Sequence, residues 1–205
     1  MPDSPNRPPR LILASSSPYR RELLERLRVP FEVVVPAIDE TPLAGETPEV
    51  TALRLAEAKA RAVASKPGAD ETALVIGSDQ VATYDGLQIG KPGTHEKALA
   101  QLQAMRGREV LFHSALCLFD NRSGVAQSVD VITRVQFRDL PDDLLEAYLR
   151  AETPYDVAGS AKSEGLGIAL LEAIYSDDPT ALVGLPLIAL SRMLLAVGFP
   201  LLGAQ

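Results

Sequence analysis

The sequence predicts an α/β fold with a mixed sheet, and three observations carry this prediction. Strand-like and helix-like segments alternate over residues 11–105, as in a sheet covered by helices. Two apolar runs, at 109–120 and 125–137, flank "NRSG" and predict an antiparallel hairpin. Of the 205 residues, 46% are hydrophobic, which is enough to bury a sizeable core.

The predicted elements follow one another in a regular order. The segments "RLILASSSPYRRELLERL" and "PFEVVVPAIDETP" give a strand, a tight turn, a helix, and a second strand that enters a Pro-bounded loop. A helix is predicted in "TPEVTALRLAEAKARAVA", because Thr47 can cap it and Pro48 suits its first position. The third strand lies in "ALVI", and a helix from a Thr94 cap to just before Gly107 precedes the hairpin.

The last third of the chain is predicted to contain two more helices. "DLPDDLLEAYLRAE" has acids in its first turn, where the helix dipole favours them. "DVAGSAKSEGLGIALLEAIYS" predicts two short extended runs around a glycine-rich bend. The final helix, "LPLIALSRMLLAV", ends before Gly198 and Pro200.

Composition and charge narrow the class of protein. We expect residues 1–9 to form a disordered N-terminal tail and residues 10–205 to form a single domain, since "MPDSPNRPP" is polar and Pro-rich. Neither a signal peptide nor a membrane-spanning run is predicted, so we expect a cytoplasmic protein with no membrane partner. The single Cys117 excludes an internal disulfide framework and is interpreted as a buried, inert thiol.

The net charge of −7 argues against a nucleic-acid partner, because such partners require a cationic surface. Any anionic substrate must therefore be met by local cations. The sequence does not settle the oligomeric state, and a homodimer stays open.

Two arginines, Arg20 and Arg21, stand in the first turn of the helix that begins after Ser17. Cations there oppose the helix dipole by roughly 0.3 to 1 kcal/mol each, whereas a bound phosphate would make the arrangement favourable. Free backbone N–H groups, the hydroxyls of the serine cluster, including Ser15 and Ser17, and a guanidinium would together form an anion cradle. Two solvated arginines are the alternative interpretation.

Three lysines are further candidates for substrate binding. Lys59 shares a stripe with the apolar Leu55 and Val63, which indicates either a ligand-binding or a snorkelling lysine. Lys91 is held in the rigid loop "GKP". Lys162 lies in the glycine-rich bend "AGSAKSEG", which is not a phosphate loop because the glycine required before the lysine is absent.

The stretch "ALVIGSDQV" places Asp79 directly after an apolar strand. An unpaired buried charge is costly, so Asp79 is either a surface turn residue or a functional acid. We expect Asp39, Glu40, Asp79 and Glu164 in loops or at strand ends, where ligands collect in α/β folds. Carboxylates without histidine or cysteine suit Mg²⁺ or Mn²⁺.

Taken in order, "LILASSSPYRRELLERL", "DE" at 39–40, "LAEAKA", "GSDQV", "GKP", "AGSAKSEGLG" and "TALVGLPL" resemble the Maf family of nucleoside triphosphate pyrophosphatases over nearly the whole chain. The resemblance implies an elongated two-lobed fold like that of inosine triphosphate pyrophosphatases, with the substrate between the lobes. It implies that Asp79 accepts the proton of the attacking water and that Glu40 and Asp79 hold a divalent metal cofactor. It also implies that the cations Arg20, Lys59 and Lys91 meet the phosphates.

Three positions separate the branches of that family. The branch acting on dTTP and UTP carries Arg, Thr and Gln where this chain has Tyr19, Gln80 and Glu164. The present trio resembles the branch that hydrolyses 7-methyl-GTP to 7-methyl-GMP and pyrophosphate, by metal-assisted attack of water at the α-phosphorus. A dTTP and UTP pyrophosphatase, or a nucleotide-binding regulator of cell division without turnover, are the alternatives.

Overall fold

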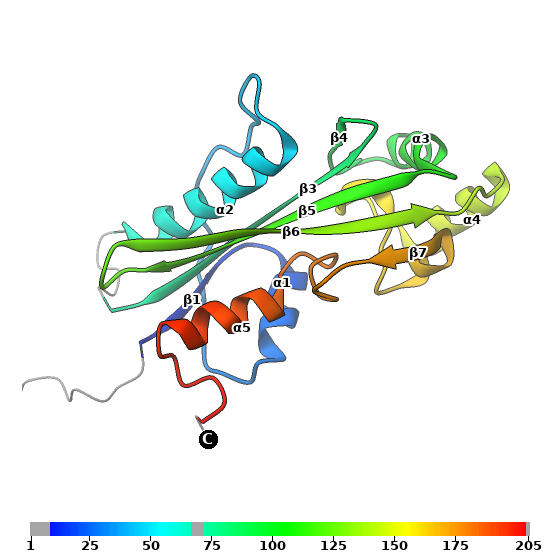
Figure 1. Ribbon diagram of the computed structural model, residues 1–205. Helices are drawn as coiled ribbons and strands as arrows, with labels where there is room; N and C mark the ends of the chain where they lie inside the picture. The colour runs from blue at the N-terminus through cyan, green and yellow to red at the C-terminus, as the bar shows by residue number, and fades with distance from the viewer. Residues whose placement is uncertain (1–8, 67–71, 204–205) are drawn as a thin grey trace, which may run out of the picture.

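The computed structural model describes residues 9–66 and 72–203, and of the tail expected at 1–9 only residue 9 falls in these ranges. Within the described residues, a mixed seven-stranded sheet runs along the elongated molecule, with helices at both ends (Figure 1). The strands are β1 (Leu11–Ala14), β2 (Glu32–Val33), β3 (Leu74–Tyr84), β4 (Leu87–Ile89), β5 (Glu109–Asp120), β6 (Val125–Phe137) and β7 (Leu171–Tyr175). The helices are α1 (Pro18–Glu25), α2 (Pro48–Ala64), α3 (His95–Met105), α4 (Asp142–Glu152) and α5 (Leu187–Ala196), and 3-10 turns lie at Ala158–Ser160 and Leu166–Leu170.

The sheet confirms the predicted mixed α/β class. Its strands lie in the order β2-β1-β3-β5-β6-β7, and β4 pairs with β3 as well. β1 is parallel to β2 and β3, whereas every other pair is antiparallel. The long antiparallel hairpin of β5 and β6 confirms the predicted hairpin, and β5 lies between β3 and β6 in the sheet.

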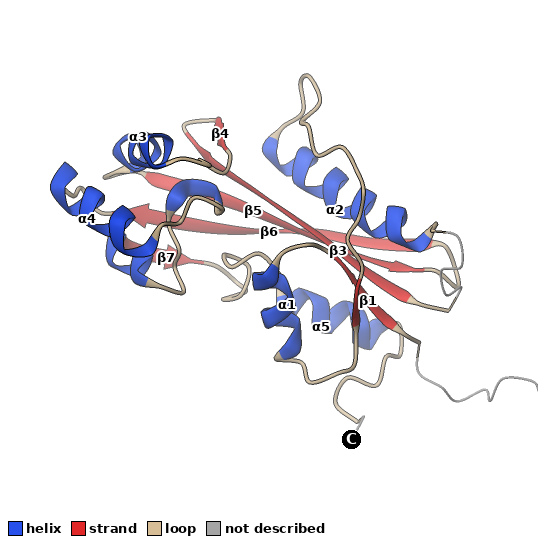
Figure 2. Cartoon of the chain, turned by 180° about the vertical axis from the view of Figure 1, so that it is seen from behind, coloured by secondary structure: helices blue, strands red, loops and turns tan. Residues whose placement is uncertain are grey.

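Helices cover the sheet in three places. α1 and α5 lie against one face near β1, and α2 lies across the opposite face (Figure 2). α3 and α4 gather at the far end of β5 and β6, where a separate core forms. The molecule therefore has the elongated, two-ended shape that the sequence resemblance implies.

The predicted helix starts are confirmed. Ser17 accepts a hydrogen bond from the Arg20 N–H at 3.4 Å, and Thr47 and Thr94 cap α2 and α3 in the same way at 3.3 Å. A side-chain oxygen at this position satisfies an N–H group that the helix itself leaves free. Cys117 is fully buried, as predicted, and burial raises the pKa of its thiol.

The strands differ from the sequence prediction in three places. β3 does not end before "GSDQ" but continues to Tyr84, because β5 pairs with it from Leu74 to Thr83. The short strand β4 was not predicted; it follows a tight turn at Asp85 and Gly86, both with positive φ, which suits a two-residue hairpin. Of the two extended runs expected near 156–176, only β7 is a strand, and the other contains 3-10 turns.

Candidate active site

The candidate site lies where one edge of β3 is open. β1 pairs with β3 only as far as Gly77, and β4 begins its pairing at Ala82. Over the intervening residues 78–81, no strand of the described chain pairs on that side. Since successive side chains of a strand point to opposite faces, an open edge lets both faces line one cavity. A pocket of about 390 Å³ lies at this opening.

Nine of the eleven predicted site residues line this pocket. They come from the β1–α1 turn, the loop before α2, α2 itself, β3 and the loop after β4. They are Ser15, Ser17, Tyr19, Arg20, Glu40, Lys59, Asp79, Gln80 and Lys91. Lys162 and Glu164 are not among the residues that line it.

The structure explains how the carboxylate of Asp79 is accommodated in an apolar strand. It is only 7% exposed and lies within β3, so the expectation of a loop or strand end was wrong, and of the two interpretations of Asp79 the surface turn residue is excluded. Lys59 of α2, only 4% exposed, donates to Asp79 Oδ1 at 2.7 Å and also lies 3.1 Å from Glu40 Oε2. The buried carboxylate is therefore paired, and one lysine joins the two acids expected to hold metal.

Gly77 makes this approach of α2 to β3 feasible. A Cβ at this position would lie 2.0 Å from the carbonyl oxygen of Ala56 and 2.8 Å from the nitrogen of Ala60. No side chain fits between the strand and the helix here. The glycine thus lets Lys59 lie directly beside Asp79.

The two arginines of α1 differ in their surroundings. Arg20 lines the pocket and donates from Nε to the Gly184 carbonyl at 2.9 Å. Burial lowers the pKa of this guanidinium, while the charges of Asp79 and Glu40 act in the opposite direction. Arg21 lies at the surface and pairs with Glu25 at 3.1 Å, so the alternative of a solvated arginine holds for Arg21 alone.

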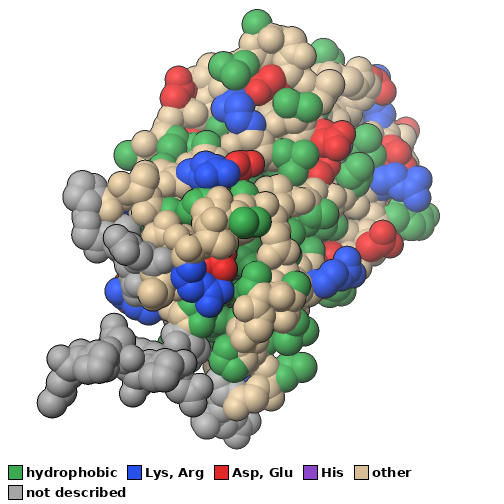
Figure 3. All heavy atoms as spheres, turned by 60° about the vertical axis from the view of Figure 1, so that its left-hand side comes forward, with side chains coloured by type: hydrophobic (Ala, Val, Ile, Leu, Met, Phe, Trp, Pro, Cys, Tyr) green, Lys and Arg blue, Asp and Glu red, His purple; other side chains and the backbone are tan. Residues whose placement is uncertain are grey.

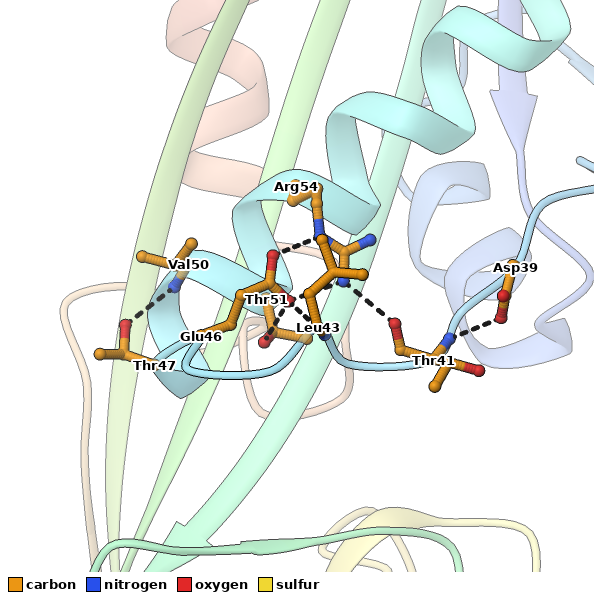
Figure 4. A network of polar contacts seen from close by, with 8 residues as sticks. All are labelled: Asp39, Thr41, Leu43, Glu46, Thr47, Val50, Thr51 and Arg54. Atoms are coloured by element: carbon orange, nitrogen blue, oxygen red, sulfur yellow. Dashed lines mark hydrogen bonds and ion pairs between the residues drawn. The ribbon is translucent and has the colours of Figure 1, made fainter.

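The loop that carries Glu40 is clamped to α2 (Figure 4). Arg54 holds Glu46 through two hydrogen bonds, of 2.5 and 2.7 Å, and reaches the Thr41 carbonyl at 3.2 Å. Glu46 also accepts from the Leu43 N–H and the Thr51 hydroxyl. The bonds from Arg54, and then those from the loop, lower the pKa of Glu46 to about 2. No sequence pattern indicated this clamp, because its partners are ordinary surface residue types.

Residues from distant parts of the chain meet around Tyr19 in the pocket lining. Tyr19 donates from its hydroxyl to Asp156 at 3.4 Å, and Asp156 lines the pocket although the sequence did not single it out. Lys162 lies over the Tyr19 ring, 5.3 Å from its centroid, and 3.6 Å from Glu152. Burial, then the charge of Asp156, raises the pKa of Tyr19, and Glu164 contributes in the same direction. Lys162 and Glu164 are thus neighbours of Tyr19 beyond the pocket wall.

The described residues contain no group of three or more His, Cys, Asp or Glu side chains that could hold a metal ion. Glu40 and Asp79, however, share Lys59 and supply hard oxygen donors. Mg²⁺ is commonly held by one or two carboxylates together with substrate phosphates. The pair therefore fits a metal that arrives with a polyphosphate better than a metal held by protein alone.

Comparison with known proteins now identifies the family. The family model described as "Maf-like protein" matches residues 10–197. The chain belongs to the Maf family. This Maf protein is 88% identical to the 7-methyl-GTP pyrophosphatase of Paraburkholderia xenovorans, over the full length of both chains. It is 79% identical to the protein of that name from Burkholderia pseudomallei, over 96% of this chain and 92% of the other.

One further relative and one solved structure complete the comparison. The 7-methyl-GTP pyrophosphatase of Ralstonia nicotianae is 71% identical over 95% of this Maf chain and 98% of its own. Among solved structures, the Staphylococcus aureus Ham1 protein is 15% identical, with a TM-score of 0.39 over 63% of this chain and 72% of the other.

No described helix of the Maf protein is long and apolar enough to cross a membrane. On the face shown in Figure 3, acidic and basic side chains are interspersed.

Proposed function

We propose that this Maf protein hydrolyses 7-methyl-GTP to 7-methyl-GMP and pyrophosphate. The observation that carries the proposal is the name shared by relatives that are 71–88% identical over at least 95% of the chain. The pocket supports it, because cations and a paired buried carboxylate meet there in an otherwise acidic protein.

In the proposed reaction, the triphosphate lies between the cations of α1, α2 and the β4–α3 loop. Arg20, Lys59 and Lys91 all line the pocket and supply positive charge from three directions. Ser15 and Ser17 add hydroxyls at the start of α1, where the helix dipole favours an anion. Cationic side chains and hydroxyl groups arranged in this way hold the phosphate oxygens while negative charge develops on the leaving pyrophosphate.

Asp79 is proposed to accept the proton of the water that attacks the α-phosphorus. Within the described chain, Lys59 donates to Oδ1 of this carboxylate. The Oδ2 atom is then available to a water molecule, and the bond to Lys59 fixes the orientation of the carboxylate. A positioned base of this kind contributes roughly 10²- to 10⁴-fold to a rate.

Glu40 and Asp79 are also proposed to hold Mg²⁺ or Mn²⁺ together with the substrate. When bound, the metal would offset the negative charge of the phosphate oxygens beside these two acids. Lys59 lies between the same two carboxylates, so the lysine and the metal would together offset the negative charge of Glu40 and Asp79.

A pyrophosphate-release assay tests the proposal. The purified protein is offered 7-methyl-GTP, GTP, dTTP, UTP and ATP with Mg²⁺, and kcat/KM is measured for each, since selectivity is a ratio of these constants. We expect the highest value for 7-methyl-GTP. A preference for dTTP and UTP would replace the proposed substrate. Tight nucleotide binding without release of pyrophosphate would favour a regulator.

A further inference from the structure

The side-chain amide of Gln80 is held in one orientation by its neighbours. Its Nε2 atom lies 2.9 Å from Ser114 Oγ, 2.9 Å from the Leu182 carbonyl and 3.2 Å from the Ala181 carbonyl. Carbonyl oxygens only accept hydrogen bonds, so the amide must turn its NH₂ end toward them. The Oε1 atom is therefore the end left for the pocket that Gln80 lines.

Ser114 completes this arrangement from β5. It is fully buried and stands directly opposite Gln80 in the register of β3 and β5. Its hydroxyl donates to the Ala181 carbonyl at 2.7 Å, so its hydrogen is already used and its oxygen accepts from Gln80. A reversed amide would place Oε1 against two carbonyl oxygens and leave the NH₂ group without these acceptors.

The segment that supplies the two carbonyls is itself fixed. Asp178 accepts from the Thr180 N–H at 3.1 Å and from the Ile188 N–H at 2.7 Å, which ties the segment to the start of α5. Ser78, also fully buried, donates to the Gly184 carbonyl at 2.9 Å. The acceptors around Gln80 therefore belong to a rigid wall, and the amide is preorganised before any ligand binds.

We propose that Ser114 is a positioning residue: with the Ala181 and Leu182 carbonyls, it locks Gln80 so that Oε1 accepts a hydrogen bond from an N–H group of the base. The identity of the base rests on the proposed function. A guanine presents two such donors, N1–H and the 2-amine, on one edge. Because the lock turns Oε1 toward the nucleotide, Gln80 acts there as a hydrogen-bond acceptor. It therefore favours a base edge that carries N–H groups over one that presents an unprotonated ring nitrogen.

A pair of Ser114 variants tests the lock by kinetics. Ser114→Ala removes one of the three acceptors of the amide and loosens its position, although the two carbonyls still prevent its reversal, so we expect kcat/KM for 7-methyl-GTP to fall about five- to tenfold. The fall should lie mainly in KM, because the hydrogen bond is made equally in the ground and transition states. Ser114→Thr keeps the hydroxyl and should stay within about twofold of the wild type.

Thr133→Val is the matched control. Thr133 is a fully buried hydroxyl on β6 that bonds Ser176 and does not line the pocket. It should lower the melting temperature without changing the ratio of kcat/KM between 7-methyl-GTP and dTTP. If Ser114→Ala leaves that ratio unchanged as well, the proposal is overturned.

Gln80→Glu tests the orientation itself. The near-isosteric carboxylate places an oxygen against the Ala181 and Leu182 carbonyls, so we expect a large loss of kcat/KM at pH 8. Wild-type kcat/KM for this variant at pH 8 would show that the NH₂ group is not needed on this wall.

A spectroscopic measurement separates the lock from the proposed function. In ¹H–¹⁵N spectra, the Gln80 side-chain NH₂ signal is the one that Gln80→Glu removes. We expect it to exchange slowly with solvent in the wild type and measurably faster in Ser114→Ala, where one of its three acceptors is missing, whether or not 7-methyl-GTP is the substrate. Rapid exchange in the wild type would refute the lock, and absence of 7-methyl-GTP turnover would refute the proposed function alone.

Discussion

Gly77→Ala is expected to disrupt both the fold and the site, because α2 touches β3 at this glycine. The added Cβ would lie 2.0 Å from the Ala56 carbonyl oxygen, whereas real Cβ atoms do not come closer than 3.0 Å. The helix must therefore move away by at least about 1 Å. Both contacting atoms belong to the backbone, so no side-chain rotation can relieve the clash.

The size of the effect follows from this geometry. Overpacking of a core costs about 1–3 kcal/mol, and in a chain of this size each kcal/mol lowers the melting temperature by about 2–4 °C. We expect a fall of roughly 2–12 °C. A shift of about 1 Å would also lengthen the 2.7 Å bond between Lys59 and Asp79 beyond hydrogen-bonding distance, so turnover should fall in the molecules that stay folded.

Calorimetry and pyrophosphate release on the purified variant measure the two effects. Gly203→Ala is the matched control, because a Cβ there meets no atom within 4 Å. It should leave the melting temperature and turnover unchanged. If Gly77→Ala matches the wild type in both measurements, α2 does not depend on this contact to bring Lys59 to Asp79, and the explanation given for the glycine fails.

Four further outcomes are expected. Asp79→Asn should cut turnover by about 10²- to 10⁴-fold in protein that still folds, with a lower melting temperature because buried Lys59 loses a charged partner, and near wild-type turnover would remove Asp79 from the role of base. Chelation by EDTA should abolish pyrophosphate release and added Mg²⁺ or Mn²⁺ should restore it, whereas full activity after exhaustive chelation would exclude the metal. Since the folded-state pKa of Glu46 is depressed to about 2, the Arg54 clamp should stabilise the protein fully above about pH 4.5 and weaken as the pH falls toward 2. Glu46→Gln should flatten this part of the plot of melting temperature against pH. A plot for the variant that runs parallel to that of the wild type would contradict the assignment. Tyr19→Arg should lower the preference for 7-methyl-GTP over dTTP in kcat/KM, because an aromatic face attracts a cationic base and a guanidinium repels it, and an unchanged preference would show that this ring does not select the base.

The local features of the fold could be predicted from the sequence. The caps at Ser17, Thr47 and Thr94 depend on side chains within three residues of the N–H groups that they satisfy. The apolar stripe around Lys59 likewise placed this lysine on the buried side of α2. Such signals are contained in short windows of the chain.

The course of β3 could not be predicted in the same way. "GSDQ" has the composition of a turn, but pairing with β5, more than 30 residues away, keeps it extended. Tertiary pairing therefore overrides local preference here. Ser114 and Asp156 were missed for the same reason, since only the register of the sheet and the folding of a distant loop bring them to Gln80 and Tyr19.

The continuation of β3 through "GSDQ" and the position of the site have one physical origin. A turn there would have placed Asp79 in solvent, where neither burial nor Lys59 would act on it. A fully paired strand would have left no access to its edge. β3 is instead supported by β5 on one side and left open between Gly77 and Ala82 on the other. Asp79 and Gln80 then project to opposite faces of a rigid strand and still line one pocket, so the proposed base and the proposed contact to the nucleotide base are positioned by the same backbone.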